Sequence, residues 1–97
     1  MGERTPLAAE DVAARLAERD GWSGDTTGIT KSFAIDFQTG THLIGDVALI
    51  AKELEHHPDV ELHWAETGFS MTTYTAGGVV TELDFKLADA IDAIADR

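Results

Sequence analysis

The sequence predicts an α+β fold, a four-stranded antiparallel sheet with helices packed on one face, in the order α-β-β-α-β-β-α. Two observations support this fold class. The spacing of hydrophobic residues switches between a helical period and strict alternation along the chain, and the short alternating segments occur in neighbouring pairs that can form hairpins. Because 97 residues suffice for one modest core, we expect a single domain over 1–97, with 1–4 as a loose tail.

The first helix is predicted to begin with Thr5 as N-cap and Pro6 at the first helical position, and to end at Asp20-Gly21. Trp22 then begins a short strand before a turn at 23–25. Residues 29–37 alternate between apolar and polar side chains, which indicates a half-buried strand.

Residues 41–55 return to helical spacing, with a wide apolar face formed by Leu43, Val47, Ile50, Leu54 and the smaller residues beside them. We expect this helix to pack against both the sheet and another subunit. Residues 60–64 and 67–73 alternate again and predict a β-hairpin that turns near 66–68. After a glycine loop at 76–78, Thr81 and Asp84 resemble a capping box at the start of a last helix.

Composition excludes several classes of function. The formal net charge is −11, with only seven Lys and Arg, so we expect neither nucleic acid nor an anionic membrane as a partner. The absence of cysteine excludes disulfides and thiolate metal sites. No stretch is apolar enough to span a membrane and no signal peptide is apparent, so we expect a cytoplasmic protein.

The segment Glu55-His56-His57-Pro58 is the strongest candidate for chemistry. Pro58 disfavours helical geometry at His57, so the pair is predicted to lie at a helix C-terminus, where the macrodipole favours the imidazolium form. Histidine can give or take a proton near neutral pH. The alternative is that the two side chains only cap the helix end. A metal site is not expected, since adjacent histidines point apart and the sequence implies no carboxylate that would orient metal-binding imidazoles by a hydrogen bond.

Several motifs together resemble the pterin-4a-carbinolamine dehydratase (4a-hydroxytetrahydrobiopterin dehydratase) family. They are, in chain order, Phe33 to Phe37, Val47-Ala48-Leu49 with Ala51, Leu54 to Pro58, Trp64, Met71-Thr72-Thr73, Gly77-Gly78, Thr81 to Phe85 and Leu87-Ala88. The resemblance covers most of the chain. It implies a hydro-lyase that dehydrates a 4a-hydroxytetrahydropterin to the quinonoid dihydropterin during tetrahydrobiopterin recycling, without a metal or organic cofactor.

The resemblance also implies a set of site residues. His56 and His57 are the expected catalytic residues, with His57 as an acid/base and His56 as its partner in binding or proton transfer. The residues expected to bind the pterin substrate are Trp64, Thr73, Tyr74 and Asp84. For Trp64 the alternative is a core or interface filler, and for Asp84 a first-turn acid stabilised by the helix dipole. A homodimer or homotetramer is expected.

The sequence departs from the family at Tyr74, where a third histidine is usual, and Lys52 stands where an acidic residue is common. A phenol can donate a hydrogen bond but is a poor base at neutral pH. The departures favour an alternative function, a catalytically weakened member that serves as an assembly or dimerisation protein, as in relatives that act as Rubisco assembly factors. A third possibility is an enzyme for a different pterin, such as a molybdopterin-related compound.

Overall fold

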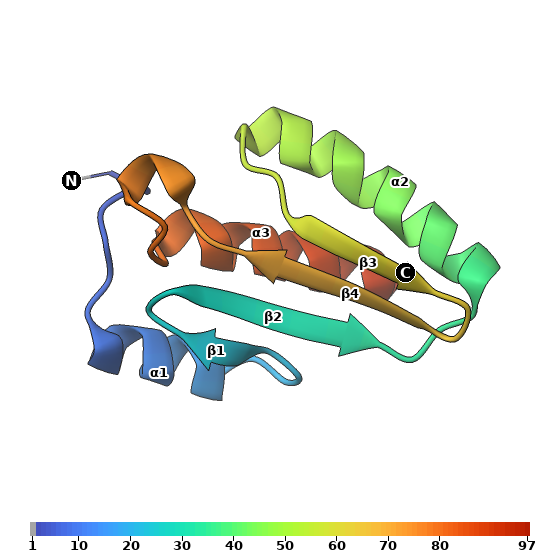
Figure 1. The fold of residues 1–97 in the computed structure, drawn as a ribbon, viewed down its shortest axis with the longest axis horizontal. Coiled ribbons are helices and arrows are strands. Elements are labelled where there is room, and N and C mark those ends of the chain that lie inside the picture. Colours follow the sequence, from blue (N-terminus) through green and yellow to red (C-terminus); the bar gives the residue numbers. More distant parts are fainter. Residues whose placement is uncertain (1) are drawn as a thin grey trace.

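The computed structural model describes residues 2–97, so Met1, the first residue of the expected tail, lies outside it. Within this range three α-helices and four strands follow one another in the predicted order (Figure 1), and the predicted fold class is confirmed. The elements are α1 Ala9–Ala17, β1 Ser23–Asp25, β2 Gly28–Phe33, α2 Phe37–Leu54, β3 Asp59–His63, β4 Glu66–Met71, the 3₁₀ turn η1 Tyr74–Ala76, and α3 Glu82–Ala95.

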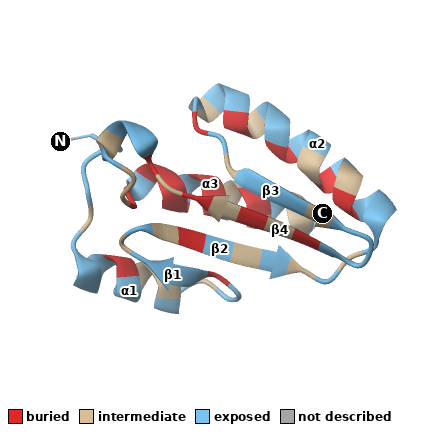
Figure 2. Cartoon of the chain, in the orientation of Figure 1, coloured by how far each residue is buried: buried red, intermediate tan, exposed pale blue. Residues whose placement is uncertain are grey.

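The strands form one antiparallel sheet in the order β1-β2-β4-β3. Helices α2 and α3 cover one face, and α3 runs behind the sheet in the view of Figure 1. The inner face of the sheet contributes Ile29, Phe69 and Met71 to a core that α2 and α3 complete with Val47 and Ile91. Figure 2 shows buried residues concentrated on β4 and α3, whereas β3, at the sheet edge, is exposed over most of its length.

The N-terminal segment differs from the prediction. Helix α1 begins at Ala9 rather than after Thr5, because Pro6 pairs with Thr81 and the Leu7 N–H donates to the Val80 carbonyl at 3.1 Å. These contacts hold the chain extended. The expected loose tail is also wrong for Glu3 and Arg4, both of which hydrogen-bond to distant parts of the chain.

Helix α2 is longer at its start than predicted. The Asp36 carboxylate caps the helix by accepting a hydrogen bond from the Thr39 N–H at 2.8 Å, so α2 starts at Phe37 and β2 ends at Phe33 rather than at residue 37. At the other end, Glu55 adopts the left-handed conformation with φ 53° and stops the helix after Leu54.

Two further boundaries also shift. The predicted turn at 23–25 is instead strand β1, and the turn that follows it lies at 26–27. Because His63 pairs with Glu66, the β3–β4 hairpin turns at Trp64 and Ala65, so Trp64 belongs to the turn and not to a strand. The capping box of α3 is confirmed: the Thr81 hydroxyl accepts from the Leu83 N–H, and the Asp84 carboxylate accepts from the Thr81 N–H.

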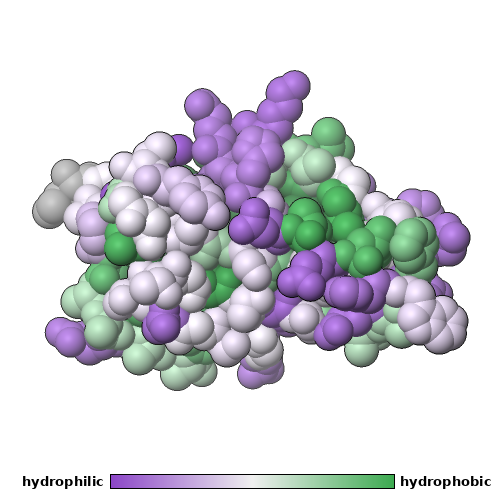
Figure 3. Space-filling view, viewed as in Figure 1, coloured by the Kyte–Doolittle hydropathy of each residue, from purple (hydrophilic) through white to green (hydrophobic). Residues whose placement is uncertain are grey.

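An apolar hollow lies on the surface between α2 and β3. Hydrophobic side chains gather at this place in Figure 3, and the hollow is lined by Ile44, Val47, Ala48, Ala51, His57, Pro58, Val60 and Phe69. No helix in residues 2–97 combines the length and apolar character that crossing a membrane requires.

Candidate active site

The two histidines leave the end of α2 in different environments. The left-handed turn at Glu55 brings the His56 N–H back to the Ala51 carbonyl at 3.0 Å. His56 is buried, with 8% of its surface exposed, whereas His57 is exposed to solvent. The turn therefore presents one imidazole to the interior and the other to the surface.

The His56 ring is held by Asp84 of α3. Its Nε2 lies 2.6 Å from Asp84 Oδ1, and the Asp84 carboxylate is fully buried. Asp84 Oδ2 accepts from the Thr73 hydroxyl at 2.8 Å and from the Thr81 N–H at 2.9 Å. Since an ionised carboxylate can only accept, Nε2 of His56 is the donor of this hydrogen bond, and Nδ1 is the acceptor whenever the ring is neutral.

The hydroxyls behind Asp84 form a directed chain. The Leu83 N–H donates to the Thr81 hydroxyl, whose oxygen is 2.8 Å from that of Thr73. Because Thr73 uses its own proton on Asp84, Thr81 donates to Thr73. The capping box of α3 and the ring of His56 thus belong to one buried hydrogen-bond network, which fixes the imidazole.

A cavity of about 330 Å³ opens beside this network. Both histidines line it, together with Arg4, Glu55, Pro58, Asp59, Thr72, Tyr74 and Thr75. Its volume lies within the range of small-molecule sites, and it contains an exposed imidazole next to a fixed one. Such a site can donate and accept protons at a bound ligand.

The family model for pterin 4 alpha carbinolamine dehydratase matches residues 5–94. The chain belongs to this family. A Streptomyces avermitilis protein named "Putative pterin-4-alpha-carbinolamine dehydratase" is 35% identical over 95 residues, which cover 93% of this chain and 90% of that protein. A Sulfolobus acidocaldarius protein of the same name is 33% identical over 89 residues, covering 91% and 97%.

Two solved structures share the fold. The transcriptional coactivator/pterin dehydratase from Brucella melitensis superimposes with a TM-score of 0.86 at 33% identity, over 94% of this chain and 99% of that one. A pterin dehydratase-like protein identified as a RuBisCO assembly factor in the alpha-carboxysome gives a TM-score of 0.60 at 20% identity, over 76% and 86%, and this likeness concerns the fold alone.

In this member of the pterin-4a-carbinolamine dehydratase family, the residues predicted for the site divide into three groups. His56, His57 and Tyr74 line the cavity, with the Tyr74 hydroxyl 3.5 Å from Asp59 Oδ2. Thr73 and Asp84 are buried and belong to the network that holds His56. Trp64 forms the third group on its own.

Trp64 lies away from the other site residues within a single chain. Strand β3 runs from Asp59, which lines the cavity, to His63, and Trp64 follows in the turn at the far end with 83% of its surface exposed. The described chain therefore brings together every predicted site residue except this one.

Four residues that line the cavity were not predicted as site residues from the sequence: Arg4, Asp59, Thr72 and Thr75. The hydroxyl oxygen of Thr72 is buried and has no hydrogen-bond partner among residues 2–97. The sequence signal for Thr72 was its place in the Met71-Thr72-Thr73 motif, beside Thr73. Arg4 came from the segment expected to be a loose tail, and nothing local in the sequence indicated its contact with the end of α2. Within the part of the chain described, no group of three or more histidine or carboxylate side chains could hold a metal ion.

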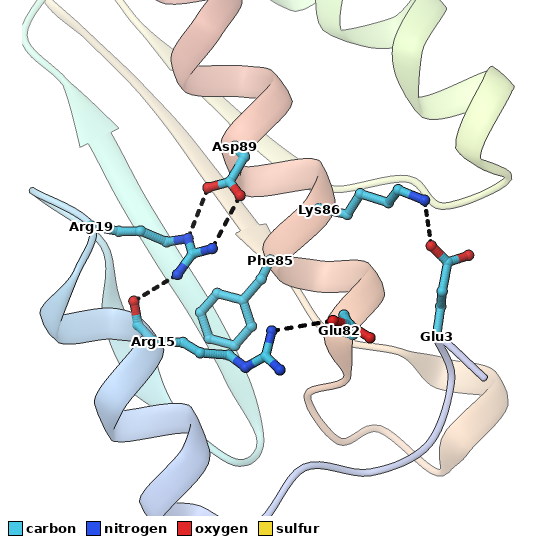
Figure 4. Close-up of a pocket in the computed structure, with 7 residues that line it drawn as sticks. All are labelled: Glu3, Arg15, Arg19, Glu82, Phe85, Lys86 and Asp89. Atoms are coloured by element: carbon cyan, nitrogen blue, oxygen red, sulfur yellow. Dashed lines mark hydrogen bonds and ion pairs between the residues drawn. The ribbon is translucent and has the colours of Figure 1, made fainter. Parts of the chain in front are cut away.

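A second cavity of about 360 Å³ lies between α1 and α3, and Figure 4 shows charged side chains around it. Arg19 binds both oxygens of Asp89, at 2.8 and 3.0 Å, and its guanidinium lies 5.0 Å from the centre of the buried Phe85 ring. The other pairs around the cavity are Arg15 with Glu82 and Lys86 with Glu3. Because each cation already faces a carboxylate, this cluster fastens α1 and the N-terminal segment to α3.

Proposed function

We propose that this protein dehydrates 4a-hydroxytetrahydropterins to quinonoid dihydropterins and water, as part of pterin recycling in the cytoplasm. The observation that carries the proposal is the pairing of a buried, carboxylate-bound His56 with a solvent-exposed His57 at one cavity. Membership of the pterin-4a-carbinolamine dehydratase family supports it.

The two imidazoles divide the proton transfers. His57 in its protonated form gives a proton to the 4a-hydroxyl, the C4a–O bond breaks, and water leaves. The electron pair released as N5 loses its proton forms the C4a=N5 double bond. His56 keeps Nδ1 as an acceptor while its Nε2–H is bound to Asp84, so it is suited to take the N5 proton. Protons, atoms and charge balance without a cofactor.

The other predicted residues bind the pterin or support the site. Tyr74 donates a hydrogen bond from the cavity wall, where the family usually has a histidine. Thr73 and Asp84 act by holding His56 rather than by touching the substrate. We also propose a homodimer or homotetramer, since Trp64 reaches a pterin only if another copy of the chain brings it there.

The test is stopped-flow dehydration of a 4a-hydroxytetrahydropterin. We expect turnover above the solvent background in the native protein and a loss of about a hundredfold or more in His57→Ala, the usual contribution of one acid/base group. His42→Ala is the matched control, because His42 is exposed near the start of α2 and does not line the cavity. An unchanged rate in folded His57→Ala protein would end this assignment.

Tyr74→His separates the enzyme from the second candidate function. If Tyr74 weakens an otherwise competent site, restoring an imidazole should raise kcat by roughly tenfold or more. The second candidate is a non-catalytic assembly or dimerisation protein, and the loss of an acid/base group at Tyr74 favours it. No turnover in the native protein, with activity gained in Tyr74→His, would mean that the site has degenerated and the fold now serves binding.

A further inference from the structure

The N-terminal strap, residues 2–7, makes a tight turn at Glu3 and Arg4, closed by the Thr5 N–H on the Gly2 carbonyl, and then runs along the loop that leads into α3. Its Glu3 carbonyl shares the Leu83 N–H with the Thr81 hydroxyl, at 3.1 and 3.2 Å respectively, and its Leu7 N–H donates to the Val80 carbonyl at 3.1 Å. The Glu3 carboxylate also pairs with Lys86 (Figure 4). Backbone hydrogen bonds and an ion pair therefore dock the strap on the first turn of α3.

Arg4 extends from the strap to the opposite side of the histidine cavity. Its guanidinium donates through Nη2 to the Glu55 carbonyl at 3.2 Å and lines the cavity beside both histidines. Glu55 is the left-handed residue that ends α2, a conformation that non-glycine residues adopt only at a free-energy cost. A hydrogen bond from a charged donor is stronger than a neutral one and can help to hold that turn.

The two strap contacts converge on the His56–Asp84 pair. Leu83, bound by Glu3, directly precedes Asp84, and Glu55, bound by Arg4, directly precedes His56. Two adjacent residues of the strap thus tie together the two segments whose side chains must meet at 2.6 Å. A shift of either segment would lengthen that hydrogen bond and turn His57 relative to the cavity.

We propose that Arg4 is a positioning residue of the active site: through the Glu55 carbonyl it holds the left-handed turn that aims His56 at Asp84 and His57 into the cavity. The proposal rests on the proposed dehydratase function for its kinetic consequence. Its structural consequence can be measured in the free protein, whatever reaction the protein catalyses.

Three variants test the role. Arg4→Met keeps most of the stem and removes the donors, and Arg4→Lys keeps a charged donor. Lys52→Met is the matched control, because Lys52 is an exposed cation in the last turn of α2 that does not line the cavity. Circular dichroism establishes that each variant is folded, which we expect because Arg4 and Lys52 are both exposed.

The first readout is the nuclear magnetic resonance of His56 in the free protein. The ¹⁵N shifts of its two ring nitrogens report whether Nε2 carries the proton, and the Nε2–H signal reports exchange with water. We expect Arg4→Met to speed this exchange by roughly tenfold through more frequent local opening. Arg4→Lys should recover part of the protection, and Lys52→Met should match the native protein. Unchanged His56 signals in Arg4→Met would overturn the proposal.

The second readout is the kinetics of dehydration. A positioning role predicts that kcat falls by roughly tenfold in Arg4→Met while KM changes little. A raised KM with native kcat and native His56 signals would make Arg4 a ligand contact only and would overturn the proposal. If the native protein shows no dehydratase turnover, the proposed function fails, and the His56 signals alone still decide whether Arg4 positions the turn.

Discussion

At Gly40, helix α2 lies directly against side chains of strands β3 and β4. A Cβ atom built on it would lie 2.2 Å from the Thr67 hydroxyl oxygen and 2.8 Å from Leu62 Cδ1, closer than such atoms approach in proteins. Thr67 is fully buried on β4, and its hydroxyl has no partner among residues 2–97. Glycine is therefore needed here for the helix to pack on the strands at this distance.

Gly40→Ala should lower the free energy of unfolding by about 1–3 kcal/mol, because the added methyl group overpacks the interface between α2 and the sheet. Gly45→Ala is the matched control: it lies in the same helix, nothing surrounds its added Cβ within 4 Å, and it should stabilise by about 0.5–1 kcal/mol. Urea unfolding of both variants measures the difference. Equal midpoints would mean that α2 can move away from Thr67 without loss.

Asp84 is the residue on which the buried network depends. Asp84→Asn should lower the free energy of unfolding by about 3 kcal/mol. One carboxylate oxygen is replaced by an NH₂ group, which would face another donor, the His56 Nε2–H or the Thr81 N–H, in a fully buried place. Asp89→Asn is the control one turn further along α3, where an exposed ion pair with Arg19 is worth at most about 1 kcal/mol. Thermal or urea unfolding compares the two, and a smaller loss for Asp84→Asn than for Asp89→Asn would contradict the network.

At the scale of elements, the start of α2 shows how a single cap decides a boundary. A hydrogen bond from the backbone N–H of Thr39 lowers the pKa of the Asp36 carboxyl below its ordinary value. The ionised carboxylate therefore favours the folded state at any pH above the range in which free carboxyl groups titrate, near pH ~4. This contribution is lost as the pH falls through the lower folded pKa.

Asp36→Ala should lower Tm at neutral pH, and the difference from the native protein should shrink as the pH is lowered below about 4. Glu53→Ala, which removes an exposed carboxylate near the other end of α2, controls for the change of charge. Thermal unfolding followed by circular dichroism across this pH range gives the result. A Tm difference that grows on acidification would show that the cap does not act through the ionised form.

The ends of elements were predictable where one local motif determines them and not elsewhere. The capping box at Thr81 and Asp84 was recognised from spacing alone, because its donors and acceptors lie within one turn. Thr5-Pro6 has an equally local helix-start signal, yet Pro6 pairs with Thr81, and this distant bridge keeps the chain extended. Likewise, Pro58 correctly indicated the end of α2, but the left-handed turn at Glu55 ends the helix earlier.

At the scale of the whole molecule, contacts between distant segments account for what the sequence could not indicate. Arg4 and Glu55 are 51 positions apart, and the alternation of apolar residues carries no information on such a pair. The same holds for Lys31 and Trp22, which both bind the Asp92 carboxylate and tie the first strands to α3. For Trp64 the opposite is true: the resemblance predicted it as a pterin-binding residue, but the turn after β3 places it outside the cavity.

The charge of the whole chain gives the last prediction. With 18 acidic and seven basic residues, the net charge of −11 makes repulsion among carboxylates larger than the attraction in the exposed ion pairs. Raising NaCl from about 20 mM to about 300 mM shortens the screening length to well under the size of the molecule. The urea midpoint should therefore rise with salt, and the free energy of unfolding should increase by an amount on the order of 1 kcal/mol.

Glu53→Lys tests whether net charge causes that rise, because it replaces an exposed acid of α2 with a base and makes the chain less negative. Its midpoint should exceed that of the native protein at low salt and converge with it at high salt, as screening removes the advantage. A native midpoint that falls on adding salt would mean that ion pairs such as Arg19–Asp89 and Lys31–Asp92 outweigh the repulsion. The ion pairs that join the α1 region to α3, Arg15–Glu82 and Arg19–Asp89, would then be a main electrostatic contribution to the stability of the fold.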